Sequence, residues 1–191
     1  MPPRLTLSLL VILVSISDVK GANLIGNPDF DASDLAFWNT FDTIQWHNAE
    51  NETGVAGSGA MLLVNNRGPL KTANAYSCIN VVPGASYWMS GWTKAGSGIS
   101  DGRATAAMSG DSYSMANCGG GSPLSEVAVT TPLSDVWFQL TAAPIVIPPT
   151  AVSIMISVVI YTGPQDASFS AWFDGLHFDD EFIFVDGFGD Q

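Results

Sequence analysis

The sequence predicts an all-β protein, an antiparallel β-sandwich, on the strength of three observations. Apolar and polar residues alternate with a period of two in short runs along most of the chain. Clusters of Gly, Pro, Asn, Asp and Ser separate these runs at fairly regular intervals. After the first residues, no segment shows a convincing helical period. Many short strands with frequent turns are typical of two packed antiparallel sheets.

The expected strands follow one another as one domain, without an internal repeat or a linker between them. Turn-forming stretches such as NNRGP (65–69), VPGAS (82–86) and TGPQD (162–166) end one run and begin the next. The strands are expected at residues 23–30, 37–47, 60–65, 75–82, 86–94, 103–108, 126–130, 136–141, 151–161, 168–178 and 181–185.

The strand expected at 86–94, SYWMSGWTK, carries bulky apolar residues on both of its sides. Tyr87 and Met89 point to one side of an extended chain, and Trp88 and Trp92 point to the other. One side of such a strand normally faces a core, and the other is normally polar. The two tryptophans are therefore candidates for a role outside the core.

The strand expected at 151–161, AVSIMISVVIY, has one face that must belong to the core. Its even-numbered residues from 152 to 160 are all Val or Ile, which form an unbroken β-branched face. The opposite face, which includes Ser153, Ser157 and Tyr161, is mixed, as expected for an exposed binding surface.

The first 21 residues are expected to be a secretory signal peptide outside the folded domain. Arg4 precedes an apolar run at 5–16, and small residues precede the expected cleavage site before Ala22. The run is shorter than the about 20 residues that span a bilayer, and an uncleaved anchor is the alternative. The folded domain is then expected at 22–185, with a tail at 186–191, in a secreted, extracellular or periplasmic protein.

The charge balance excludes two classes of partner. The chain has 18 acidic and 6 basic residues, a formal net charge of −12. Such a surface repels nucleic acid and anionic lipid, so we expect neither nucleic-acid binding nor membrane insertion. It attracts cations, calcium in particular. The oligomeric state is left open by the sequence.

Cys78 and Cys118 are the only cysteines in the chain. An even number of cysteines behind an export signal predicts one disulfide bond between them. Two free buried thiols are the alternative.

Four segments resemble carbohydrate-binding modules related to families 4, 9 and 22. They are NLIGNPDFDASDLAFW (23–38), YSCINVVPGASYWMSGWTK (76–94), VWFQLTAAPIVIPPTAVSIMISVVI (136–160) and AWFDGLHF (171–178). The ending EFIFVDGFGDQ and the cysteine pair also look like secreted bacterial proteins that carry such a module. The resemblance implies a β-sandwich jelly roll, similar to galactose-binding-like domains.

The resemblance also implies a structural calcium ion. In such modules the ion lies between an N-terminal acidic pair and the aspartate of the last strand, which match Asp29, Asp31 and Asp174 here. Calcium prefers oxygen ligands, in a mixture of carboxylates and backbone carbonyls. The turn at 58–61 is a further candidate source of ligands. The alternative is that these acids are solvated surface residues.

The aromatic residues outside the core are candidates for binding a glycan. The resemblance implies that the strands carrying Trp88, Trp92 and Tyr161 lie in one sheet, and Trp46 is a further candidate. Aromatic rings stack on the C–H faces of sugars, while their polar groups bond hydroxyls. The alternative is that the loop at 109–123 covers these rings.

These observations predict a secreted, non-catalytic carbohydrate-binding protein whose ligand is a polysaccharide or other glycan. The alternative is a structural or adhesive extracellular protein that uses the same sandwich without a sugar site. An enzyme is not expected, because no hydrolase or metalloprotease motif stands in a convincing context and no pair of carboxylates flanks a cleft.

Overall fold

The computed structural model describes residues 23–180, apart from 34, 49, 55–57, 69, 98–103, 143 and 162–167. Within this part of the chain, no helix is long and apolar enough to cross a membrane. The expected signal peptide, the tail and the strand at 181–185 lie outside the described residues. The strands are β1 (Asn39–Thr40), β2 (Thr43–His47), β3 (Ala60–Asn65), β4 (Thr72–Asn80), β5 (Ser86–Ala95), β6 (Thr105–Tyr113), β7 (Ser125–Pro132), β8 (Phe138–Thr141), β9 (Ile145–Val146), β10 (Ser153–Tyr161) and β11 (Phe169–Asp179), with a 3₁₀ turn, η1, at Ala116–Cys118.

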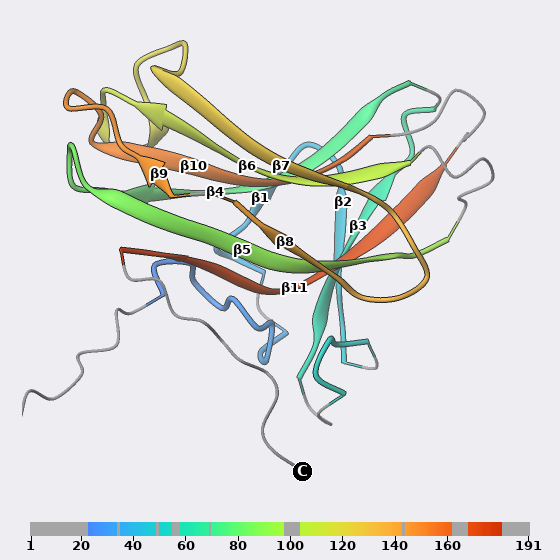
Figure 1. Cartoon of the computed structure of the whole chain (residues 1–191). Helices are drawn as coiled ribbons and strands as arrows, with labels where there is room; N and C mark the ends of the chain where they lie inside the picture. The colour runs from blue at the N-terminus through green and yellow to red at the C-terminus, as the bar shows by residue number, and fades with distance from the viewer. Residues whose placement is uncertain are drawn as a thin grey trace, which may run out of the picture.

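The strands form two antiparallel sheets that pack face to face, which confirms the predicted sandwich (Figure 1). The five-stranded sheet has the order β1-β4-β10-β6-β7. The six-stranded sheet has the order β2-β3-β11-β5-β8, and β9 pairs with β5 beside β8. Strands adjacent in the sheets are often distant in sequence, as in a jelly roll.

The core lies between the inner faces of the two sheets. The even-numbered residues of β10 from Ile154 to Ile160 are completely buried there, as the sequence predicts. Phe173 and Phe178 of β11 and Met89 of β5 face them from the six-stranded sheet and are also fully buried. Each such side chain contributes roughly 1.5–3 kcal/mol through burial.

Residues 23–30 do not form the expected strand. Asn27 and Phe30 have φ angles of 49° and 47°, and this left-handed conformation interrupts an extended chain. The segment is instead tied to β11, because the N–H of Leu24 donates to the carbonyl of Phe178 and that of Leu176 donates to Pro28. The side chain of Phe30 is fully buried.

The strand expected at 37–47 is divided into β1 and β2, which belong to different sheets. The break occurs at Thr40, whose hydroxyl accepts a hydrogen bond from the N–H of Asp42 and donates one to the carbonyl of Asn74. The chain therefore crosses from one sheet to the other at this point. The sequence analysis also missed the two-residue strand β9.

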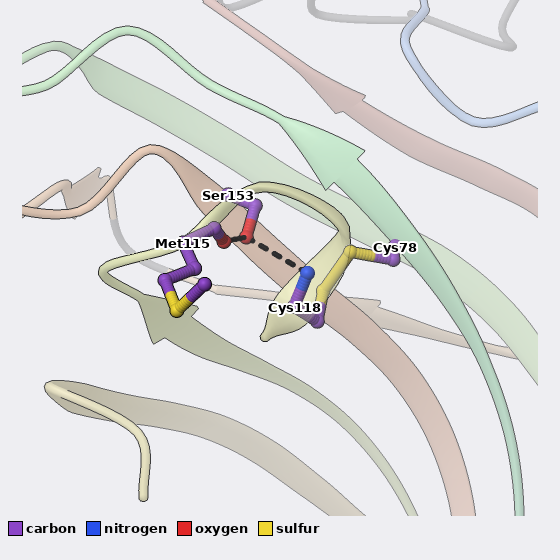
Figure 2. The surroundings of a disulfide bond; sticks show 4 residues. All are labelled: Cys78, Met115, Cys118 and Ser153. Carbon is purple, nitrogen blue, oxygen red and sulfur yellow. Dashed lines mark hydrogen bonds between the residues drawn. A yellow bond between two sulfur atoms is a disulfide. The ribbon is translucent and has the colours of Figure 1, made fainter. Parts of the chain in front are cut away.

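The predicted disulfide between Cys78 and Cys118 is present, with a Cα–Cα distance of 5.9 Å. It links β4 to η1, and Figure 2 shows η1 lying across the end of β10 beside Ser153. The hydroxyl of Ser153 donates to the carbonyl of Met115 at 2.6 Å and accepts from the N–H of Cys118 at 3.0 Å. Two strands of the five-stranded sheet therefore hold this turn.

Candidate functional site

The structure separates the aromatic residues that the sequence analysis grouped together. Trp88 and Trp92 lie on β5 in the six-stranded sheet, whereas Tyr161 ends β10 in the five-stranded sheet. All three point away from the core, because Tyr87, Met89 and the even-numbered residues of β10 point into it. The expectation that their strands share a sheet is therefore wrong. The three rings lie on opposite outer faces of the sandwich and cannot form one platform.

Trp88 and Trp92 lie on the outer face of the six-stranded sheet, which we call the tryptophan face. The residues that follow β2 partly cover this face. The N–H of Glu52 donates to Asp174 Oδ2 at 2.9 Å, and Lys94 Nζ lies 2.8 Å from Glu50 Oε2. Asp174 pairs across the sheet with Trp92, and both tryptophans are half-buried. Residues 50–54, and not the expected loop at 109–123, are therefore the segment that crowds this face.

The fit around Trp92 is tight. A Cβ atom placed on Gly175 would lie 3.0 Å from the Trp92 ring and 3.7 Å from Glu52 Oε1. Gly175 also has a φ angle of 52°, within a register shift between Asp174 and His177. Glycine thus fits both the left-handed backbone and the close approach of the indole.

Trp46 is not part of either outer face. It pairs with Met61, a buried core residue, and so points to the inner side of the six-stranded sheet at its edge. Its indole N–H donates to the carbonyl of Phe30 at 2.6 Å. Trp46 therefore binds the segment at residues 23–30 to the sandwich through this hydrogen bond.

Asp29, Glu52 and Asp174, from three separate segments, interact electrostatically beside the tryptophan face. Burial raises the pKa of Asp174 to about 7, even though N–H donors from Glu52 and Gly175 act to lower it; the charges of Glu52 and Asp29 raise it further. Burial likewise raises the pKa of Asp29, with Asp31 adding to the effect and His177 opposing it. Burial and the charge of Asp29 raise the pKa of Glu52. The three groups therefore destabilise one another when all are ionised.

The expected calcium ligands are only partly brought together. Asp29 and Asp174 interact electrostatically, and the Ser58 hydroxyl donates to the carbonyl of Asp29 at 3.3 Å, so the 58–61 turn does approach this site. Asp31 is exposed, and the sequence analysis did not anticipate Glu52. Among the described residues, no group of three or more His, Cys, Asp or Glu side chains is arranged to hold a metal ion. An ion here would need backbone carbonyls as well as carboxylates.

The outer face of the five-stranded sheet carries a different set of side chains. Tyr161 is 41% exposed, and four residues before it Ser157 pairs with Tyr76 of β4 on one side and Ser109 of β6 on the other. Residues paired across strands share a face, so Tyr76 and Tyr161 lie on this face about 14 Å apart along β10. Beside the Tyr76 ring the floor consists of small side chains such as Ser157, which is 3% exposed.

Phe41 extends this aromatic surface at the edge of the sheet. Its ring is 78% exposed and lies 6.4 Å from the Tyr76 ring, measured between centroids. A hollow of about 230 Å³ adjoins it, lined by Phe41, Asp42, Thr43, Val64, Asn66 and Arg67. Arg67 and Asp42 form an ion pair at 2.7 Å, and Asp42 also accepts the N–H of Asn74.

Sequence reasoning missed Phe41 and Tyr76 as site candidates. Tyr76 alternates with buried Ala75 and Ser77, which is a readable signal for an outward ring. Phe41 was assigned to the middle of an uninterrupted strand, so nothing in that assignment distinguished it.

Comparison with known proteins shows that the fold is similar to that of solved structures, but it does not assign the sequence to a family. No protein-family model and no curated protein matches the sequence. A module with β-1,4-galactotriose bound, TmCBM61, has a TM-score of 0.57 at 15% identity, over 84% of this chain and 99% of that one. The CBM22-2 xylan-binding domain of Paenibacillus barcinonensis Xyn10C has a TM-score of 0.59 at 9% identity, over 81% and 98%. The chain has the jelly-roll fold of carbohydrate-binding modules.

Other solved structures contain this fold as one part of a larger protein. The enzymatically active domain of bacteriophage CBA120 tailspike protein 4 has a TM-score of 0.61 at 13% identity. The match covers 82% of this chain, which spans only 21% of the tailspike chain. The same jelly roll therefore occurs both as a separate module and inside enzymes.

The raised pKa of Asp174 predicts that the free energy of unfolding falls as pH rises. The pKa of Asp174 is about 7 when folded and 3.8 ordinarily, so between these values the folded protein binds more protons than the unfolded chain. In the presence of a chelator, the melting temperature should therefore decrease from about pH 5 to pH 8. Asp174→Asn should flatten this decrease, and Asp135→Asn, at an exposed position outside the group of Asp29, Glu52 and Asp174, serves as the control. A melting temperature that rises over this range would contradict the electrostatics described above.

Proposed function

We propose that this chain is a secreted, non-catalytic carbohydrate-binding module that binds a glycan on the outer face of its five-stranded sheet. The observation that carries the proposal is the gathering of three aromatic rings beside this face: Phe41 and Tyr161 are exposed, and Tyr76, which lies 6.4 Å from Phe41, is half-buried. Aromatic rings stack on the C–H faces of sugars, and the side chains between them supply hydrogen bonds to hydroxyls.

Several polar groups lie beside the rings on this face. Ser157 and Ser109 form a cross-strand pair level with Tyr76, and Asn74, which pairs with Val159, lies on the same face between the levels of Tyr76 and Tyr161. Hydroxyl and amide groups both donate and accept hydrogen bonds, which suits the hydroxyls of a neutral sugar. The ion pair of Arg67 and Asp42 adds charged groups beside Phe41.

The tryptophan face of the six-stranded sheet is less suited to a glycan. Trp88 and Trp92 are half-buried, as Tyr76 is, but here residues 50–54 are bonded to Asp174 and Lys94 beside the rings. A sugar there would have to displace the Lys94–Glu50 ion pair or stack on the remaining parts of the rings. We therefore assign the glycan to the outer face of the five-stranded sheet. Trp88 and Trp92 are assigned a role mainly in packing.

A calcium ion is part of the proposal and acts on stability. The mutual repulsion of Asp29, Glu52 and Asp174 supports it, because a divalent cation among these groups would favour their ionised forms. The ion would join the N-terminal segment, the 50–54 segment and β11. It lies on the opposite side of the sandwich from the proposed glycan.

The first test concerns the aromatic rings. Tyr161→Ala and Tyr76→Ala should each weaken glycan binding by roughly 1–3 kcal/mol, because aromatic anchors supply much of the contact energy. Calorimetry with xylohexaose and β-1,4-galactotriose measures this, after a glycan array that includes both sugars. Trp92→Ala is the matched control: it should lower the melting temperature and leave the affinity nearly unchanged.

Two outcomes would redirect the proposal. Loss of binding in Trp92→Ala with no effect of Tyr76→Ala or Tyr161→Ala would move the site to the six-stranded sheet. No binding to any glycan by the folded protein would favour a structural or adhesive role for the sandwich.

The second test concerns calcium. Adding the ion to the chelator-treated protein should raise the melting temperature, because a ligand that binds only the native state stabilises it. Asp174→Ala and Asp29→Ala should remove most of this increase, and Asp111→Ala, on the other sheet, should keep it. Identical melting curves with calcium and with chelator would rule out the ion.

A further inference from the structure

The outer face of the five-stranded sheet is blocked at one end by the disulfide-linked turn at residues 114–119. Ser153, at the start of β10, points to this face but is completely buried, because the turn lies on it. Its hydroxyl bonds both Met115 and Cys118, as Figure 2 shows. Met115 is 58% exposed at the surface of the turn.

The turn is held firmly in this position. Cys118 is bonded covalently to Cys78 on β4 and by its N–H to Ser153 on β10, so two neighbouring strands fix it. At the other end of the same face, Tyr161 and its ladder partner Thr72 are exposed. The face is therefore asymmetric along β10: the turn covers one end, and Tyr161 and Thr72 are exposed at the other.

An unused hydrogen-bond acceptor lies next to the covered end. Asp111 of β6 pairs with Met155 of β10, whose partner on the other side is Cys78, so all three point to this face. The Oδ1 atom of Asp111 is buried and has no hydrogen-bond partner. Burial and the charge of Glu126 raise the pKa of this carboxyl. The Asp111 side chain as a whole is only half-buried, so a ligand hydroxyl can reach its exposed part and add a hydrogen bond to a carboxyl that is poorly satisfied in the free protein.

We infer that this face recognises the end of a glycan chain and not an internal stretch of it. The terminal sugar lies against the turn at Met115 and Cys118 and donates a hydroxyl hydrogen bond to Asp111, while the sugars that follow stack on Tyr76 and Tyr161. A chain running along β10 in this way cannot continue past the turn. The inference rests on the proposed function and adds to it the class of ligand.

The number of protein molecules bound per glycan chain tests this directly. Calorimetric titrations use xylohexaose against long soluble xylan, and β-1,4-galactotriose against long β-1,4-galactan. A chain-end site binds one protein per chain whatever the chain length, with a similar dissociation constant for short and long chains. A number of bound proteins that rises in proportion to chain length would overturn the inference.

Asp111→Ala tests the contact at the covered end. It should weaken binding by roughly tenfold or more, because a hydrogen bond to a charged group is lost from the complex. Glu126→Ala is the matched control: it removes the same charge from the neighbouring, exposed position and should bind as the unmodified protein does. Unchanged affinity in Asp111→Ala would overturn the contact.

The glycan site and the chain-end preference are distinguishable by experiment. If Tyr76→Ala weakens binding but stoichiometry grows with chain length, the glycan site stands and the chain-end inference falls. If no glycan of the array binds, or if both tyrosine variants bind as the unmodified protein does, the proposed function falls and the inference falls with it.

Discussion

The register of β10 between β4 and β6 is the constraint on which the rest of the structure depends. All nine residues of β10 pair with both neighbours, so each one has a fixed inner or outer side. The even-numbered residues from Ile154 to Ile160 are thereby placed in the core, and Ser153, Ser157 and Tyr161 are placed outside. A slip by one residue would exchange the two sets and bury a tyrosine where an isoleucine packs. The same register brings Ser153 under the disulfide-linked turn.

The sequence was sufficient for those features that depend on local periodicity. The core face of β10, the outward direction of Trp88 and Trp92, and the Cys78–Cys118 disulfide all follow from alternation or from cysteine count. The irregular course of residues 23–30 did not follow, because it depends on hydrogen bonds to β11, far away in the sequence. The break at Thr40 similarly depends on Asn74, a residue of another strand.

The candidate site was the least predictable part, because alternation gives the side of a strand but not the sheet to which the strand belongs. Trp88 and Tyr161 look equivalent in sequence, yet β5 and β10 lie in opposite layers. Exposure is also decided by distant segments: Glu50 and Glu52 crowd Trp92 through contacts with Lys94 and Asp174. Phe41 became a candidate only when the structure placed its ring beside Tyr76.

The most direct test of the central claim is an NMR titration of the isotope-labelled protein with xylohexaose and β-1,4-galactotriose. The claim is that a glycan binds the five-stranded sheet and not the tryptophan face. It predicts that the largest shift changes occur at the amides of Tyr76, Ser109, Ser157 and Tyr161, while the indole signals of Trp88 and Trp92 stay in place. Large shifts of those two indole signals, with the β10 amides unmoved, would contradict it.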